Sequence, residues 1–239
     1  MYGVVPAAGR GTRLRPRTDT QPKGMVDVAG RPLLEHVFET LRASGVEEIV
    51  VVVGYRKAQI IEHFGDAYEG VPITYAHQRE QRGLGHAVLQ ATPHVDSDFV
   101  VLNGDNVFQG DLSWAIEEWT DKQPDAAVVV ETVDRDTAAE TGVLTVDDAN
   151  RVTDIVEKPD DPPSTLVTTG AYIATTELFD ALALLRPSDR GEYELTDGIG
   201  ILRRAGADVL AVELTHRRVN VNRSADIGRA ESILRTETG

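Results

Sequence analysis

The sequence contains no cysteine, which excludes disulfide bonds, thiolate nucleophiles and metal centres with cysteine ligands. Redox chemistry would therefore need a bound organic cofactor. The sequence also lacks any run of about eighteen consecutive apolar residues, the length that a membrane-spanning helix requires. Its first residues have the pattern of a strand rather than of a signal peptide. We therefore expect a cytoplasmic protein with no membrane partner.

Lysine is scarce, with four residues against twenty arginines, and the formal net charge is -15. Nucleic-acid binding normally needs a broad basic face, so this charge argues against nucleic acid as a partner. A strongly acidic surface repels itself at low ionic strength, and dissolved salt screens that repulsion. We hypothesise a halophilic protein of a high-salt cytoplasm, while an ordinary acidic protein remains the alternative.

The apolar segments predict an α/β fold. With 239 residues, 41% of them hydrophobic, the chain is long enough for one sizeable core, and we expect a single domain over 1–239. Buried parallel strands are indicated at Ile49–Val53 and Phe99–Leu102, where β-branched residues follow one another without polar alternation. Between the strand at 3–7 and the strand at 49–53, Pro32 begins an amphipathic helix and Gly45 ends it, which makes a βαβ unit.

Further elements follow the same reasoning. We expect helices at 56–64, 85–92, 112–121, 176–184, 193–205 and 224–235, and strands at 73–76, 126–131 and 208–214. The strand-like stretches 142–146, 152–157 and 166–174, separated by turn-rich segments, predict a small antiparallel insert over the sheet at about 134–174. The prediction is a Rossmann-like, mostly parallel mixed sheet with helices on both faces.

Cationic side chains gather near the N-terminus, in a chain that is otherwise acidic. Residues 3–25 contain one acid and five cations: Arg10, Arg13, Arg15, Arg17 and Lys23. A glycine-containing loop follows the first strand and consists of Ala8, Gly9, Arg10, Gly11 and Thr12. Such a loop turns sharply and directs backbone N–H groups outward, which favours an anion such as phosphate. A solvated arginine-rich turn is the alternative.

Two known phosphate loops do not match this segment. The Gly-Lys-Ser/Thr ending of a Walker A loop is absent, and a dinucleotide fingerprint would have glycine where Leu14 stands. The string from Gly9 to Pro16, with Lys23 seven residues later, instead resembles the signature of the sugar-1-phosphate nucleotidylyltransferases. The resemblance implies a fold of the nucleotide-diphospho-sugar transferase type. It also implies that the loop residues Ala8, Gly9, Gly11 and Thr12 bind nucleotide, and that Arg13 and Lys23 act on its phosphates.

Asp105 lies just beyond the carboxyl end of the buried strand 99–102, where open α/β sheets bind their ligands. An aspartate in this place is often only a turn or cap residue. The segment Gly104-Asp105-Asn106, however, resembles the Gly-Asp motif of the family, whose aspartate coordinates Mg²⁺. The family's second metal ligand is commonly an aspartate near the C-terminus, and here Asn220 stands in its place, with Asn222 close by. An amide carbonyl is an oxygen ligand that Mg²⁺ accepts, and which of the two asparagines binds stays open.

The segment 77–87 resembles the family's base-reading loop, with Gln78 and Gln81 before Gly83. A glutamine amide both accepts from N3–H and donates to a carbonyl oxygen of uracil or thymine. His86 is expected to pack or cap a helix rather than to transfer protons. The alternative for both glutamines is an exposed polar loop.

A last set of residues resembles the family's sugar-phosphate contacts. Lys158 follows a predicted strand and would bind the acceptor phosphate, while Glu157 would accept hydrogen bonds from sugar hydroxyls. Gly142, Thr169 and Gly170 match positions where the sugar meets backbone. An exposed Glu-Lys pair in a turn is the alternative. The segment 190–197 also resembles the start of a helix in the family. It is interpreted as scaffold, and whether it lies near the sugar stays open.

Four segments occur in the family's order and together cover nearly the whole chain. The resemblance implies an enzyme that uses Mg²⁺ to transfer a nucleotidyl group from UTP or dTTP to a sugar-1-phosphate, with glucose-1-phosphate preferred. N-acetylglucosamine-1-phosphate, mannose-1-phosphate and a non-catalytic nucleotide-sugar-binding regulatory homologue are the alternatives. A glycosyltransferase is disfavoured because Val107 replaces the second aspartate of Asp-x-Asp, and an oxidoreductase is disfavoured by Leu14. The partners are then small phosphorylated substrates, and a homo-oligomer stays open.

The charge composition gives a first testable prediction. The melting temperature, followed by circular dichroism from low to molar KCl, is expected to rise because salt screens the repulsion between surface carboxylates. A melting temperature that stays constant or falls as KCl increases would contradict the halophilic hypothesis.

Overall fold

A computed structural model describes residues 1–235. The α-helices, with their bounds, are α1 (Leu33–Ala43), α2 (Lys57–Phe64), α3 (Leu84–Leu89), α4 (Ser113–Lys122), α5 (Arg135–Ala139), α6 (Glu177–Ala183), α7 (Leu195–Arg204) and α8 (Ser224–Arg235). Three short 3-10 helices are η1 (Thr12–Leu14), η2 (Lys23–Met25) and η3 (Thr92–His94).

The strands form one large sheet and two small pairs. Their bounds are β1 (Tyr2–Pro6), β2 (Asp27–Val28), β3 (Arg31–Pro32), β4 (Glu48–Val53), β5 (Ala67–Tyr68), β6 (Val71–His77), β7 (Phe99–Leu102), β8 (Asn106–Phe108), β9 (Ala126–Thr132), β10 (Gly142–Val146), β11 (Val152–Glu157), β12 (Leu166–Ala174), β13 (Val209–Glu213) and β14 (Arg218–Asn220). Among these residues no helix has the length and apolar character needed to cross a membrane.

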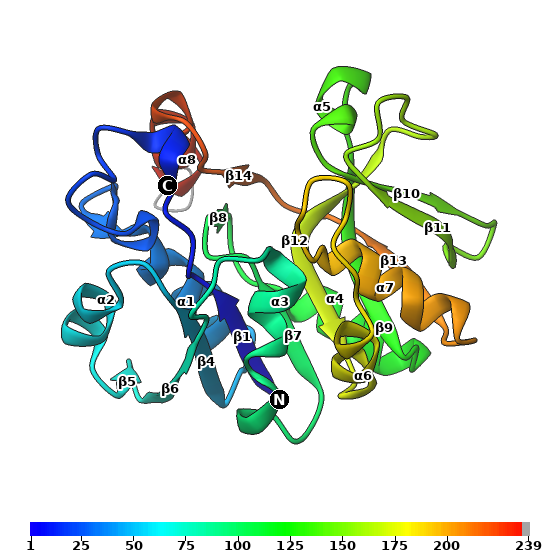
Figure 1. The fold of residues 1–239 in the computed structure, drawn as a ribbon, viewed down its shortest axis with the longest axis horizontal. Helices are drawn as coiled ribbons and strands as arrows, with labels where there is room; N and C mark the ends of the chain where they lie inside the picture. Colours follow the sequence, from blue (N-terminus) through cyan, green and yellow to red (C-terminus); the bar gives the residue numbers. More distant parts are fainter. Residues whose placement is uncertain (236–239) are drawn as a thin grey trace.

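The large sheet has the strand order β11-β10-β12-β7-β1-β4-β6-β5, and β9 joins β12 to β13 (Figure 1). The strands β7, β1, β4 and β6 pair in parallel, whereas β12 is antiparallel to both β7 and β9. All the predicted helices and strands are present, with ends that differ by up to three residues. The predicted mixed α/β fold is confirmed, while the single domain stays a prediction.

Both faces of the sheet are buried because successive residues of a strand point to opposite sides. Val50 and Val52 of β4 belong to one hydrophobic cluster, and Ile49, Val51 and Val53 belong to another. Helices α3, α6 and α7 contribute to the first cluster, and α1, α2 and α4 contribute to the second. Uninterrupted β-branched runs are therefore the sequence pattern of strands covered by helices on both sides.

The placement of the antiparallel insert over the sheet was wrong. Strands β10 and β11 pair beside β12 in the large sheet itself and extend its edge. The nine-residue strand β12 makes this possible, because its first half pairs with β10 and its second half pairs with β7. Its register with β9 shifts between Thr168 and Tyr172, and Gly170 within that stretch has a φ of +83°. Alternation in the sequence identified the strands but not their partners.

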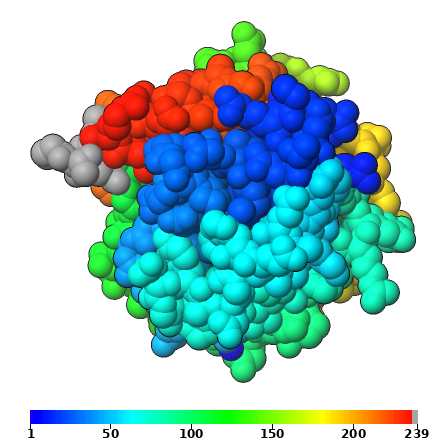
Figure 2. Space-filling view, turned by 90° about the vertical axis from the view of Figure 1, so that its left-hand side faces the viewer, coloured from blue at the N-terminus to red at the C-terminus, as the bar shows by residue number. Residues whose placement is uncertain are grey.

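The last part of the chain returns to its beginning. After β13 it passes through β14, which pairs with β8, and ends in α8 beside the N-terminal segment (Figure 1). A third hydrophobic cluster includes Leu14, Val107, Val221 and Ile227. Figure 2 shows the C-terminal segment in red lying against the N-terminal segment in blue on one face. The loop after β1 is therefore held from both ends of the sequence.

Candidate active site

The loop after β1 and the turn after β7 face one cavity, which has a volume of about 320 Å³. Both segments follow parallel strands that are neighbours in the sheet, and the carboxyl ends of such strands are the usual place for a ligand. Its walls include Gly9, Gly11, Arg13, Lys23, Asp105 and Asn222. Segments that are almost 200 residues apart in the sequence thus meet at this cavity.

The glycine loop is shaped by Gly11 and anchored by Leu14. Gly11 has a φ of +62°, a conformation that residues with a side chain rarely adopt, and it is followed directly by η1. Its carbonyl oxygen accepts a hydrogen bond of 2.8 Å from the Thr18 hydroxyl. Leu14 is fully buried in the third hydrophobic cluster. The loop therefore presents Thr12 and Arg13 to the cavity from a fixed backbone.

Lys23 lies at the centre of the site. Its ammonium nitrogen Nζ is 2.7 Å from Asp105 Oδ2 and 2.7 Å from Asn222 Oδ1. The Lys23 side chain is 15% exposed and that of Asp105 is 26% exposed. This partial shielding from water strengthens the attraction between the two charges. Two oxygen atoms from distant segments thus point to one position that a positive charge occupies.

The two candidate asparagines have different roles in this arrangement. Asn222 contacts Lys23 through its amide oxygen, and its amide nitrogen donates to Asn220 Oδ1 at 2.8 Å. Asn220 thereby orients Asn222 and lies one step further from Asp105. The backbone is fixed here as well, because the Val221 N–H donates to the Asp105 carbonyl oxygen at 2.8 Å. Asp226 accepts from the N–H of Asn222 at 2.9 Å.

The donor atoms around Lys23 suit a hard cation. A carboxylate and an amide carbonyl are oxygen ligands, which Mg²⁺ prefers, and it takes few of them from protein when phosphate supplies the others. Within residues 1–235, no three histidine, aspartate or glutamate side chains gather as a larger metal site would require. A divalent ion held by Asp105 and Asn222 together with a bound phosphate fits these residues.

The base-reading loop lies beside the glycine loop. Gln78 is 5% exposed, and its amide nitrogen donates to the Gly83 carbonyl oxygen at 3.1 Å and lies 2.9 Å from His86 Nδ1. A carbonyl oxygen only accepts, so this contact fixes which end of the amide is nitrogen. Gln81 donates to the Ala8 carbonyl oxygen at 2.6 Å and so links the two loops. Burial and the nearby Arg82 lower the pKa of His86, which agrees with the expected packing role.

The predicted sugar-contacting residues form a neighbouring cluster. Glu157 lies 3.2 Å from Lys158 and 3.6 Å from Arg190, and it accepts a hydrogen bond of 3.1 Å from Thr196. Gly142 belongs here, because a Cβ at its position would lie 3.0 Å from Glu157 Oε2. Burial, and then the charges of Glu194 and Glu157, raise the pKa of Asp197. The cluster therefore concentrates carboxylates around two cations.

Thr169 and Gly170 lie where β12 passes the Asp105 turn. The Thr169 side chain is buried and donates to the Val129 carbonyl oxygen at 2.8 Å, which braces β12 against β9. The Gly170 carbonyl oxygen accepts from the Asn103 N–H at 2.9 Å. These two residues thus position the end of β7 from behind. Among the described residues, the walls of the 320 Å³ cavity include neither of them, nor Glu157 or Lys158.

Two residues at the site had no assigned role in the sequence. Arg190 lies 2.8 Å from Glu194 and 3.6 Å from Glu157, so it joins Lys158 as a second cation of the cluster around Glu157. Its segment was recognised, but its contacts depend on a fold that brings α7 to β11. Asn103 lines the cavity, and its buried Oδ1 has no hydrogen-bond partner among the described atoms. Its position just before Gly104 and Asp105 was the available signal.

Comparisons with known proteins identify the family. The model of the family described as nucleotidyl transferase matches residues 2–238. The chain is 47% identical over 238 residues to UTP–glucose-1-phosphate uridylyltransferase AglF of Haloferax volcanii, covering 100% of this chain and 98% of that protein.

Two solved structures are similar over almost the whole chain. A putative glucose-1-phosphate thymidylyltransferase from Bacillus anthracis has a TM-score of 0.87 at 28% identity, covering 98% of this chain and 96% of that one. A UDP-glucose pyrophosphorylase solved with UDP-glucose has a TM-score of 0.90 at 24% identity, covering 99% and 98%. The second similarity concerns the fold alone.

The packing at Gly170 gives a prediction about how the site is supported. A Cβ at this position would lie 2.5 Å from Asn106 Nδ2 and 2.7 Å from Asn103 Nδ2. Gly170→Ala is expected to lower the free energy of unfolding by at least about 1 kcal/mol more than Gly110→Ala, because overpacking adds to the backbone strain. Gly110 is a matched control, since its φ is +80° and a Cβ there would meet no atom within 4 Å. Urea unfolding measures the free energy of unfolding of both variants. Equal decreases in the two variants would contradict the close packing of Gly170 against Asn103 and Asn106.

Proposed function

The chain belongs to the nucleotidyl transferase family, and from this premise we propose that it transfers a uridylyl group from UTP to glucose-1-phosphate, giving UDP-glucose and pyrophosphate. The observation that carries the proposal is the meeting of the glycine loop, Lys23 and Asp105 at one cavity. The activity for which AglF is named supports the choice of UTP and glucose-1-phosphate. dTTP is the second candidate nucleotide, because the same amide contacts fit thymine.

The nucleotide is held between the two loops. The backbone N–H groups around Gly9 and Gly11, together with Arg13, bind the β- and γ-phosphates. Both hydrogen bonds described for Gln78 use its amide nitrogen, and we assign its carbonyl oxygen to accept the N3–H of the base. Gln81 exchanges its contact with Ala8 for the base. Cytosine has no N3–H and fits this arrangement poorly.

The acceptor is held by the neighbouring cluster. Lys158 and Arg190 bind the phosphate of glucose-1-phosphate, and Glu157 and the backbone at Gly142 contact the sugar hydroxyls. Two polyanions approach each other here, so fixed cations offset the repulsion between their phosphates. The Asn103 amide, which lines the same cavity as Asp105, supplies a further polar contact for the nucleotide.

The reaction is an in-line displacement at the α-phosphorus. An oxygen of the sugar phosphate forms the new P–O bond, the bond to the β-phosphate oxygen breaks, and pyrophosphate leaves with that electron pair. Lys23 moves from Asp105 toward the α-phosphate and stabilises the negative charge that develops there. Asp105 and Asn222 would hold Mg²⁺, and a bound Mg²⁺ would supply Lewis-acid stabilisation of the phosphate oxygens.

The surroundings of the enzyme are part of the proposal. The acidic composition and the Haloferax source of AglF support a halophilic protein in a cytoplasm rich in salt. The alternative of a non-catalytic nucleotide-sugar-binding homologue is favoured by Asn220, which replaces a carboxylate. We prefer the enzyme because Asp105 and Asn222 already direct two oxygens to one cationic position.

A substrate matrix tests the proposed reaction. Pyrophosphate release is measured for UTP, dTTP, CTP, ATP and GTP against glucose-1-phosphate, N-acetylglucosamine-1-phosphate and mannose-1-phosphate, at low and at molar KCl. We expect the highest kcat/KM for UTP with glucose-1-phosphate, and at least about a tenfold loss with CTP because an amide that requires N3–H is left unpaired. A higher kcat/KM with another sugar-1-phosphate would mean that glucose-1-phosphate is not the acceptor. If no pair of substrates released pyrophosphate, the non-catalytic homologue would be favoured.

Asp105 gives a sharper prediction about mechanism. Asp105→Ala is expected to lower kcat/KM for pyrophosphate release by about 10²-fold or more, because the carboxylate that anchors the cation is lost. The fold should persist, since Asp105 is partly exposed at the end of a strand. Asp121→Ala, which removes an exposed carboxylate of α4, is the control and should retain activity. Near-normal turnover of Asp105→Ala would refute the proposed metal position, and circular dichroism reports on folding.

A further inference from the structure

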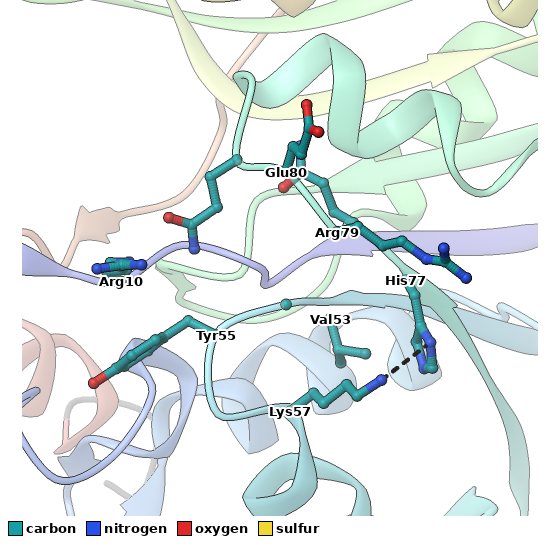
Figure 3. A pocket seen from close by; sticks show the side chains of 10 residues that line it. Arg10, Val53, Tyr55, Lys57, His77, Arg79 and Glu80 are labelled. Carbon is teal, nitrogen blue, oxygen red and sulfur yellow. Dashed lines mark hydrogen bonds between the residues drawn. The ribbon is translucent and has the colours of Figure 1, made fainter.

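A second cavity lies on the other side of the base-reading loop. Its volume is about 570 Å³, compared with about 320 Å³ for the cavity at Asp105. It opens where β4 and β6 end, and Tyr55, Lys57, His77 and Arg79 are among the residues that line it (Figure 3). This volume lies within the range of about 300–1,000 Å³ that small-molecule sites have. The reaction proposed above does not use most of its walls.

The cavity concentrates positive charge in an acidic protein. Arg10, Lys57 and Arg79 line it, and the one acidic residue among its walls, Glu80, pairs with Arg82 at 3.2 Å. In the part of the chain that the structure describes, none of the three cations has a carboxylate within 4.0 Å. The sequence has 39 acidic residues, so partners were available. Three uncompensated cations around one hollow create a field that attracts an anion.

Neutral groups hold two of these cations in place. Lys57 Nζ lies 3.3 Å from His77 Nδ1, and the Arg10 guanidinium carbon lies 5.4 Å from the centroid of the Tyr55 ring. Figure 3 shows Arg10 and Tyr55 at one side of the cavity, and Lys57, His77 and Arg79 at the other. Burial, and then the charges of Lys57 and Arg79, lower the pKa of His77. His77 therefore stays neutral near pH 7 and leaves the Lys57 charge available to a ligand.

We propose that this cavity is a second ligand site, which binds a molecule with a chain of two or more phosphates and is separate from the catalytic cavity. Cations on both sides of the cavity match a ligand whose negative charges are spread along its length. Inorganic polyphosphate and a nucleoside diphosphate or triphosphate share this chemistry. The site deepens the proposed function and rests on it, because ligands of this kind include its own substrate and product.

The second cavity shares a wall with the nucleotide site. Gln78 and Gln81 line it, and the same two side chains fix the base-reading loop through Gly83 and Ala8. A ligand that contacts this wall stabilises one arrangement of the loop. We therefore expect its binding to change the KM for UTP more than the kcat, since the loop holds the base rather than the reacting phosphates.

The test follows His77, which reports on this cavity and not on the other. Metal-free full-length protein in EDTA, at a fixed KCl concentration that keeps it folded, is titrated with inorganic tripolyphosphate while the imidazole NMR signals of His77 are recorded. We expect a saturable shift of these signals and a rise in the His77 pKa, because a bound anion offsets Lys57 and Arg79. His216, which lies elsewhere near Trp114, should not respond.

Variants locate the response. Arg79→Gln and Lys57→Gln are each expected to raise the half-saturating tripolyphosphate concentration at least about tenfold. Lys122→Gln and Arg135→Gln, which remove exposed, ion-paired cations of α4 and α5, should change it less than twofold. Arg13→Gln alters the catalytic cavity alone and should also leave the His77 response unchanged. UDP in the nucleotide site would also contact Gln78 beside His77, so the titration with UDP is compared between wild type, Lys57→Gln and Arg79→Gln. A half-saturating concentration raised in these variants assigns the UDP response to the second cavity, and the ligand with the lower half-saturating concentration there is the better match.

Three results would overturn the proposal. They are no His77 response at saturating ligand, an unchanged half-saturating concentration in both Arg79→Gln and Lys57→Gln, or loss of the response in Arg13→Gln. The last would mean that the ligand acts from the catalytic cavity. The proposed reaction is judged separately by pyrophosphate release, and Arg79→Gln should keep its kcat within about twofold because Arg79 does not line the catalytic cavity. An inactive wild-type protein that still shows the His77 response would contradict only the reaction.

Discussion

The contact between Lys23 and the oxygens of Asp105 and Asn222 is the constraint on which the site depends. It joins the segment after β1, the turn after β7 and the segment after β14 at a single nitrogen atom. A carboxylate partly shielded from water is less stable without a partner, so the three segments stabilise one another by meeting there. The same arrangement holds a positive charge where a metal ion and a phosphate would meet, which links stability to the proposed chemistry.

Much of the fold follows from local sequence, and the pairing of its edge strands does not. Each of β4, β7 and α1 can be recognised from its own residues. Runs of β-branched residues identify β4 and β7 as buried strands, and an amphipathic pattern identifies α1 as a helix. Strands β8 and β14 are three residues each, and 112 positions separate their paired residues Val107 and Val219. Their pairing depends on where β13 ends, which no local pattern encodes. The edge position of β10 and β11 was missed for the same reason.

The candidate site shows the same division. The glycine loop, Asp105 and the base-reading glutamines are recognisable because each lies in a short motif with fixed spacing. The motifs left the metal-facing asparagine undecided, and the geometry favours Asn222, since Asn220 contacts Asn222 rather than Lys23. Arg190 and the cluster of Arg10, Lys57 and Arg79 were found only in three dimensions. The role of these cations depends on whether carboxylates lie near them in the folded protein, and the sequence alone does not show those contacts.

The clustering of Leu14 with Val221 and Ile227 has a consequence for shortened forms of the chain. A polypeptide that extends only as far as β13 already contains the glycine loop and Asp105, but it lacks the Val221 and Ile227 part of this cluster and the Asn222 amide that completes the cation position. The cavity with its complete set of walls therefore requires residues on both sides of the large sheet's sequence, and a polypeptide that stops before residue 218 has no Asn222 to place beside Lys23.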